Sequence, residues 1–205
     1  MSSDKITVRR FSVGTHALPT MLSLSLTVAL SGGATLAKEC KGVNFPEQIQ
    51  VDGVTLVLNG TGLRQATTFK VSVYVAALYV PKPSNDAAAL LTADTPKQIT
   101  LQFVRNVGAN DLRKAWTEGF ERNAKATLPA LKDRISTFNG WMEDMKTGGR
   151  MTLTYKIGSG VEVNVNGAAK GTINGDDFAK ALFAIWLGDP PNPEIKAGLL
   201  GGPCA

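Results

Sequence analysis

The stretch NGTGLRQATTFKVSVYVAALYV, residues 59–80, decides the fold predicted for this chain. From position 69 to position 79 the odd residues are all apolar or aromatic, whereas the even residues are mixed. A period of two with one wholly apolar face is typical of a strand that packs that face in a core. Prolines at 81 and 83 end the run, because proline cannot donate a hydrogen bond to a neighbouring strand. The glycine-bearing segment 59–64 is interpreted as a loop that leads into this strand.

Shorter elements are predicted on both sides of this stretch. The further strands are 48–51, 54–58, 99–105, 150–157, 161–165 and 170–173. Apolar residues spaced by three and four predict helices over 112–124 and 131–145. A short helix is expected over 86–91, and an acidic start with a glycine and prolines at the end predicts a buried helix over 176–188. Strands, then helices, then strands and a last helix predict an α+β domain, with a large antiparallel sheet covered by helices.

The first 37 residues have the order of a secretory signal peptide. Lys5, Arg9 and Arg10 precede an apolar stretch over 17–30, and small residues up to Ala37 come before charged residues. The apolar stretch is shorter than the roughly 20 residues of a membrane span. We therefore expect an exported, periplasmic protein with a leader over 1–37 and one domain over 38–205; an uncleaved anchor is the alternative.

The charge of the chain gives little support to nucleic-acid binding. The whole sequence has 22 basic and 17 acidic residues, and removal of the leader leaves 19 and 16, a net charge of about +3. The basic residues of the predicted domain are scattered among acidic ones, as on a solvated helix face. We expect no nucleic-acid partner.

Cysteine and histidine content limits the chemistry that the domain can perform. Cys40 and Cys204 are the only cysteines and lie at the two ends of the predicted domain, so an oxidising compartment would permit a disulfide between them, although both thiols could also stay unpaired. His16 is the only histidine and lies in the leader. A catalytic triad with histidine and a histidine-bearing zinc site are therefore excluded from the domain, and no metal or nucleotide motif is present.

Four segments together resemble the chalcone isomerase-like family. They are NGTGLR at 59–64, FKVSVYVAALYV at 69–80, the segment 106–118 with LRKAW at 112–116, and 175–188, which begins GDDF and ends IWLG. The resemblance spans Val51 to Leu200 and is strongest to the exported bacterial branch. It implies an open-faced β-sandwich in which the ligand lies between the large antiparallel sheet and a layer of helices.

The resemblance also implies where a site would lie. In chalcone isomerase, an arginine of the Gly-x-Arg segment binds the substrate phenolate, and Arg64 is at that place. Tyr74 replaces a threonine that chalcone isomerase uses. Its tyrosine and asparagine fall at Asp111 or Leu112 and at Glu118 or Gly119, and its last hydroxyl residue falls near Ile195. The loss of these hydroxyl and amide groups puts the cyclisation reaction in doubt.

Arg64 together with Tyr74 is instead similar to the fatty-acid-binding branch, in which such a pair holds a carboxylate. An arginine donates two hydrogen bonds and a phenol a third, which suits one anionic head group. Arg105 is a third candidate, because it continues the apolar line of the predicted strand 99–105. For each arginine, the alternative is an ion pair with a nearby acidic residue. For Tyr74, the alternative is a core or edge residue of the sheet. The aromatic and methionine side chains of the helices are interpreted as core, with Trp116 and Trp186 among them.

Three functions remain open from the sequence. The first is binding of a fatty acid or similar small anionic amphiphile. We expect no cofactor for this function, and the protein would contact a membrane only through an uncleaved leader. The second is an isomerase or intramolecular lyase acting on an enone or phenolic substrate through Arg64 and Tyr74. The third is a non-catalytic structural accessory protein of the envelope. The sequence does not predict an oligomeric state.

Overall fold

The computed structural model describes residues 37–204. The predicted leader lies outside the described residues, except for Ala37. Within the described range no helix is both long enough and apolar enough to cross a membrane.

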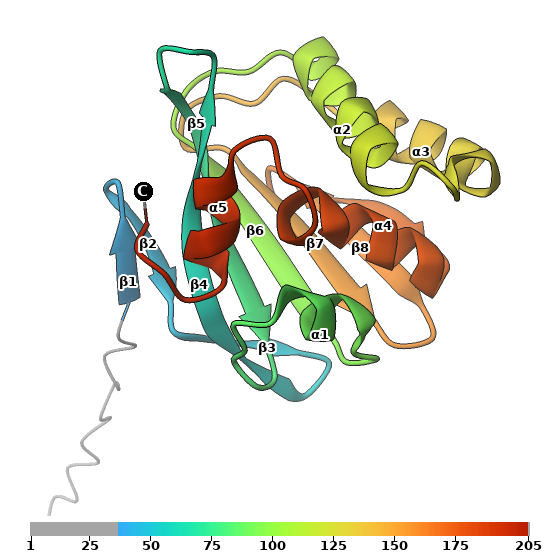
Figure 1. Ribbon diagram of the computed structural model, residues 1–205, viewed down its shortest axis with the longest axis horizontal. Coiled ribbons are helices and arrows are strands. Elements are labelled where there is room, and N and C mark those ends of the chain that lie inside the picture. The colour runs from blue at the N-terminus through green and yellow to red at the C-terminus, as the bar shows by residue number, and fades with distance from the viewer. Residues whose placement is uncertain (1–36, 205) are drawn as a thin grey trace, which may run out of the picture. The chain divides into compact units, whose positions relative to one another are not determined.

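A curled antiparallel sheet of seven strands forms the centre of the fold (Figure 1). Its strands neighbour one another in chain order: β3 (Gln48–Val51), β4 (Val54–Ala66), β5 (Val71–Val80), β6 (Lys97–Phe103), β7 (Arg150–Lys156), β8 (Gly160–Val165) and β9 (Ala168–Ile173). A separate hairpin consists of β1 (Ala37–Cys40) and β2 (Val43–Pro46).

Helices cover one face of this sheet. They are α1 (Ala87–Thr92), α2 (Ala109–Asn123), α3 (Leu128–Gly140), α4 (Asp176–Leu187) and α5 (Pro193–Leu199). α4 packs against β8, α1 and α2, whereas α5 lies along β4, as Figure 1 shows in red and teal. The predicted α+β fold, with a large antiparallel sheet covered by helices, is confirmed.

The alternation in β5 separates two apolar clusters. Its even positions from Tyr74 to Val80 belong to the main core, together with the helices. Its odd positions Val75, Ala77 and Tyr79 belong to a smaller cluster on the other face of the sheet, which includes residues of the β1–β2 hairpin. Both faces of β5 are therefore buried from Tyr74 onward, not only the wholly apolar one.

The prediction of a loop over 59–64 is wrong, because this segment is the second half of β4. Its glycines serve a different purpose from a turn. A Cβ atom at Gly60 would collide with the backbone of Gly198 and Leu199, and one at Gly62 would collide with the carbonyl of Ile195. The absence of side chains on this strand is what allows the backbone of α5 to lie directly against it.

Three predicted elements end earlier or begin later than the pattern suggests. Phe69 precedes β5 and lies exposed in a turn. β6 stops at Phe103, so Arg105 lies beyond the strand. α3 ends at Gly140, so Met145, which continues the apolar spacing, lies beyond the helix and pairs with Val107 in an isolated bridge.

The two ends of the described chain meet at the smaller cluster. Cys40 and Cys204 are joined by a disulfide, with their Cα atoms 5.9 Å apart. Cys40 is buried in this cluster and Cys204 packs against it. The bridge therefore attaches the segment after α5 to the β1–β2 hairpin.

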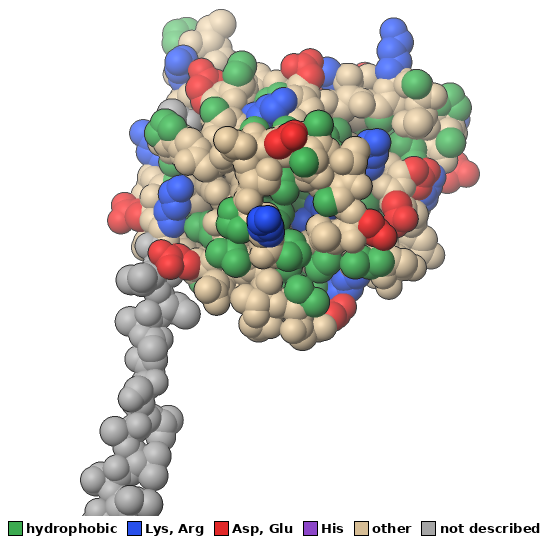
Figure 2. All heavy atoms as spheres, turned by 60° about the horizontal axis from the view of Figure 1, so that its bottom comes forward, with side chains coloured by type: hydrophobic (Ala, Val, Ile, Leu, Met, Phe, Trp, Pro, Cys, Tyr) green, Lys and Arg blue, Asp and Glu red, His purple; other side chains and the backbone are tan. Residues whose placement is uncertain are grey.

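Charged side chains are mixed on the molecular surface. Figure 2 shows basic and acidic groups interspersed over the face that contains α1, at the bottom of Figure 1. The short-range ion pairs follow the same pattern, since Lys156 contacts both Asp52 and Glu162 at the surface. This face has the character of a solvated surface.

Candidate ligand-binding site

A cavity of about 610 Å³ opens between the β4–β5 hairpin and α2. Its walls come from four parts of the chain: the two strands, the 105–107 segment after β6, the inner face of α2, and Ile185 and Pro191 near the C-terminal helices. The volume falls in the range of about 300 to 1,000 Å³ that is usual for small-molecule sites. The apolar part of the lining consists of Ala66, Val73, Val107, Leu112, Ala115, Trp116, Ile185 and Pro191.

Strand register brings the two principal candidates together. Arg64 on β4 and Tyr74 on β5 are opposed across the antiparallel pair. The register then shifts, because Gln65 is opposite Ser72 and Val73 is left over as a β-bulge. The bulge turns Val73 toward the main core, beside Tyr74, so both side chains line the cavity.

Arg64 is half-buried in the cavity wall. Its Nη1 lies 3.4 Å from Oδ1 of Asn192, a weak contact. Asn192 is itself fixed to β4, because its amide donates to the Leu63 carbonyl at 3.1 Å and its oxygen accepts from the Gln65 amide at 3.3 Å. Among residues 37–204 no carboxylate forms an ion pair with Arg64. A partly desolvated cation thus faces the cavity without a direct ion-pair partner in the described chain.

Electrostatics of the Arg64 guanidinium follow from this burial. Desolvation lowers the pKa of Arg64 from its ordinary value, and the nearby cation of Arg122 adds to this, whereas Tyr74 and Glu118 act in the opposite direction. An arginine remains charged at neutral pH despite such a shift. Binding an anion here would replace the water that the guanidinium has lost.

Tyr74 offers a neutral hydroxyl next to this cation. Only 5 % of the residue is exposed, and its ring packs against Phe103 at 5.4 Å between centroids. Burial raises the pKa of Tyr74 to about 12, although Arg64 and the hydrogen bond from Trp186 reduce the effect. The hydroxyl accepts a hydrogen bond from Nε1 of Trp186 at 3.0 Å.

That contact leaves the phenolic proton of Tyr74 free. A phenol has one donor hydrogen, and an indole N–H can only donate, so the Trp186 contact uses the oxygen as an acceptor. Within the described part of the chain, Trp186 is the only hydrogen-bond partner of the Tyr74 hydroxyl. A buried donor without an acceptor is unfavourable, and a ligand oxygen in the cavity would satisfy it.

Arg105 reaches the same cavity from a different element than the sequence suggests. It lies in the exposed segment after β6, which is held to β5 by the bond from the Val104 amide to the Val73 carbonyl at 3.0 Å. The interpretation of Arg105 as the last residue of a strand is therefore wrong, whereas its position on the cavity lining brings it together with Arg64 and Tyr74. No ion pair involves Arg105 among residues 37–204.

Most positions that the resemblance assigns to the catalytic groups of chalcone isomerase also lie in the lining. Asp111, Leu112, Glu118 and Gly119 all face the cavity from α2. Ile195 does not, because it is buried in α5 against Gly62. The cavity thus keeps the location of the chalcone isomerase site that the resemblance implies, with different chemical groups around it.

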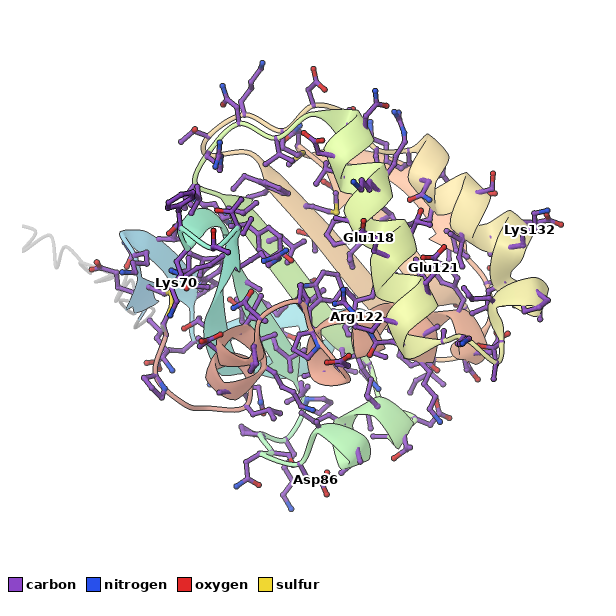
Figure 3. The ribbon with its side chains drawn as sticks, turned by 45° about the horizontal axis from the view of Figure 1, so that its top comes forward. Lys70, Asp86, Glu118, Glu121, Arg122 and Lys132 are labelled. Carbon is purple, nitrogen blue, oxygen red and sulfur yellow. A yellow bond between two sulfur atoms is a disulfide. The ribbon has the colours of Figure 1, made fainter. Side chains whose placement is uncertain are left out.

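Several residues in or beside the cavity wall are not predicted from the sequence. Arg122 lies one turn after Glu118 on α2, and Figure 3 shows both on this helix. Asn192 and Pro191 come from the connection between α4 and α5. Trp186, interpreted as core, is buried there, but its N–H also orients the Tyr74 hydroxyl. Only the Asn192-Pro193 helix start is a local signal, and it does not indicate a ligand.

Comparisons with known proteins agree with this architecture. The family model described as chalcone isomerase-like matches residues 37–201. No curated protein matches the chain. Among solved structures, the crystal structure of a fatty-acid binding protein from Arabidopsis thaliana is similar, with a TM-score of 0.59 at 17% sequence identity, over 78% of this chain and 92% of that chain. At such low identity the structural likeness shows a shared fold. The match over four fifths of the sequence shows that this chain belongs to the chalcone isomerase-like family.

Proposed function

We propose that this protein binds a fatty acid or a similar small anionic amphiphile in the cavity between β4, β5 and α2. The observation that carries the proposal is the pair of Arg64 and Tyr74 in the cavity wall. Arg64 is a half-buried cation without an ion-pair partner among residues 37–204. Tyr74 is a buried phenol whose proton has no acceptor among the same residues. A carboxylate would accept from both groups, which are adjacent across the strands. Charge-assisted hydrogen bonds of this kind are about twice as strong as neutral ones.

The remaining lining suits the tail of an amphiphile. Val73, Leu112 and Trp116 present apolar surface beside the Tyr74 ring. Burial of apolar area contributes roughly 25 cal/mol per Å², so an alkyl chain on this wall would add to the affinity of the head group. The similarity to a fatty-acid binding protein of the same fold supports this ligand class.

Export belongs to the same proposal. The basic, apolar and small-residue order of residues 1–37 has the form of a secretory leader. The Cys40–Cys204 disulfide is compatible with an oxidising compartment such as the periplasm.

Direct measurement of a bound ligand tests the function. Protein purified from cells and then denatured should release a carboxylate-bearing lipid, which mass spectrometry identifies. Titration with palmitate should show saturable binding, and hexadecanol, which lacks the carboxylate, should bind far more weakly. Arg64→Ala should weaken palmitate binding by about 10- to 100-fold, because a hydrogen bond to a charged group contributes roughly 1.5 to 3 kcal/mol.

A matched control separates this effect from a general loss of charge. Arg134 pairs with Asp177 on the surface of α3 and α4, outside the cavity, so Arg134→Ala should leave palmitate binding unchanged. Absence of any lipid in the extract, together with equal palmitate affinity of the parent and Arg64→Ala, would rule the proposal out. Arg64-dependent conversion of an enone or a hydroxychalcone, without lipid binding, would favour the isomerase alternative.

A further inference from the structure

The turn between β4 and β5 presents an unusual side chain to solvent. The last cross-strand pair is Ala66 with Val71, and residues 67–70 form the turn beyond it, which we call the β4–β5 tip. The amide of Lys70 donates to the carbonyl of Thr67 at 3.1 Å. Phe69, which lies in this turn, is the most exposed large apolar residue of the described chain, with 88% of its surface accessible.

The backbone of the tip is held in a shape that local preference does not explain. Thr67 has φ +63° and Lys70 has φ +51°, in the left-handed region that β-branched and long side chains seldom adopt. The hydroxyl of Thr67 accepts from the amide of Phe69 at 3.3 Å, which helps to close the turn. A glycine or asparagine would suit these positions better, so the sequence keeps a conformation that projects Phe69 outward at some cost.

The tip also adjoins the mouth of the cavity. Ala66 and Thr67, the residues that lead into it, line the cavity together with Arg105. Single exposed apolar residues are common on protein surfaces. Phe69 differs in lying at the end of a protruding hairpin, two residues from a lining residue of an amphiphile-sized cavity.

We infer that the β4–β5 tip inserts Phe69 into the interfacial region of a lipid bilayer. This insertion would set the cavity mouth against the membrane. An amphiphile would be taken up from that membrane or delivered to it. This inference rests on the proposed function for its choice of partner, since a bilayer is the source of such ligands. It extends the expectation from sequence, in which only an uncleaved leader would reach a membrane.

The charges around the tip fit an anionic bilayer surface. Lys70 lies in the tip, shown on the β4–β5 side in Figure 3, and Arg105 lies on the cavity rim. Each basic residue near an anionic surface strengthens membrane binding several-fold. Phe69 insertion would be the main contact with the bilayer, and Lys70 and Arg105 would add contacts to lipid phosphates.

A tryptophan placed in the tip reports its location directly. The full-length Phe69→Trp variant should show a blue-shifted emission with vesicles of phosphatidylcholine and phosphatidylglycerol, and brominated lipid chains should quench it. Phe69→Ser should reduce vesicle binding by about 10- to 100-fold, which corresponds to exposing one large apolar side chain. Lys70→Gln should weaken binding mainly to vesicles that contain phosphatidylglycerol.

The chain offers a matched control in Ile157, an exposed apolar residue in the β7–β8 turn with 52% of its surface accessible. Ile157→Trp should not be quenched by brominated lipid, and Ile157→Ser should bind vesicles like the parent. All variants are prepared with the same N-terminus, so any membrane contact of residues 1–37 is the same in each. An unquenched Phe69→Trp would overturn the inference, whatever else anchors the chain. If Phe69→Ser instead dissociates a dimer and vesicles are not bound, the tip is a contact between copies of this chain.

The two proposals can fail separately. Vesicles free of fatty acid test the tip without a ligand, and the Phe69→Trp reporter should be quenched by brominated lipid equally well with and without the additional change Arg64→Ala. Conversely, Phe69→Ser should still bind dissolved palmitate in the absence of vesicles. Loss of palmitate binding in Phe69→Ser without vesicles would show that Phe69 supports the cavity itself and would overturn its assignment to the membrane.

Discussion

Arg64 and Tyr74 are direct cross-strand neighbours, and the Tyr74 hydroxyl takes its hydrogen bond from Trp186 at 3.0 Å rather than donating one. The cation and the free phenolic proton therefore lie side by side in the cavity wall. This arrangement leads to predictions for ligand affinity, for the pH dependence of stability and for the packing of the C-terminal segment.

The first prediction concerns coupling between the two head-group residues. Tyr74→Phe should weaken palmitate binding by about 2- to 10-fold, less than Arg64→Ala, because a neutral hydrogen bond contributes roughly 0.5 to 1.5 kcal/mol. In the double variant the two losses should not simply add, since both groups hold one carboxylate. Calorimetric titration of the four proteins measures this coupling, and strictly additive losses would argue against a shared head-group site.

The same Tyr74→Phe variant should also be less stable without any ligand. Trp186 is fully buried, and its N–H would lose its acceptor, which costs about 1 to 3 kcal/mol in the free energy of unfolding. Urea unfolding of the ligand-free protein gives this value. It has to be measured before the affinity of the variant is interpreted.

A second prediction concerns alkaline pH. Burial raises the pKa of Tyr74 and of Tyr79 to about 12, and burial with hydrogen bonds to Asp176 and Asp94 raises the pKa of Tyr155 as well. These three are the only tyrosines of the chain. An unfolded tyrosine ionises near pH 10, so the stabilisation is complete below about pH 10 and is lost as the pH rises toward 12.

Ultraviolet absorbance of phenolate should therefore show no titration near pH 10 in the folded protein. The absorbance should instead rise together with loss of helical circular dichroism, as the protein unfolds. A reversible one-proton step near pH 10, in a protein that keeps its helical signal, would contradict the burial of at least one phenol.

A third prediction concerns the glycines of β4. Gly62→Ala should destabilise the protein by about 1 to 3 kcal/mol, because the new Cβ would collide with the Ile195 carbonyl. It should also lower palmitate affinity, since Arg64 lies two residues further along this strand. Gly140→Ala is the control: its Cβ would meet no atom within 4 Å at the end of α3, and it should leave stability unchanged or raise it by up to about 1 kcal/mol. Equal effects of the two changes in thermal unfolding would refute this account of the motif.

A fourth prediction concerns the Cys40–Cys204 disulfide, which joins residues 164 positions apart. Removing it should lower the free energy of unfolding by about 2 to 5 kcal/mol. Cys204→Ser is the milder change, because Cys204 is half-buried whereas Cys40 is buried. A reducing agent should destabilise the parent to the same extent and have no effect on Cys204→Ser; an insensitive parent would mean that the bond does not form.

Sequence reasoning found the elements that have a regular period or clear end signals. The alternation over residues 69–80 predicted β5, which begins at Val71, and the acidic start and glycine stop over 176–188 predicted α4. The family resemblance named Arg64 and Tyr74 as a pair. The resemblance did not predict that the two residues are opposed across the strands, which depends on the β-bulge at Val73.

What could not be predicted depends on contacts between distant segments. Glycines at 60 and 62 signal a turn and a close backbone approach equally well, and only the position of α5 distinguishes the two. Met142 and Met145 continue a helical spacing, yet Met142 accepts the Trp116 N–H at 3.0 Å from outside the helix. Asn192 and Arg122 have no local pattern that connects them with Arg64 across more than 50 residues.

Contact partners in the cavity wall lie far apart in the sequence, which determines when during synthesis the cavity can form. Trp186 and Asn192 follow Tyr74 and Arg64 by 112 and 128 residues. The cavity wall is therefore complete only when nearly the whole domain has been synthesised, because a shorter chain lacks the contacts that Trp186 and Asn192 make with Tyr74 and Arg64. A ligand held by these groups would therefore bind only after the polypeptide is complete.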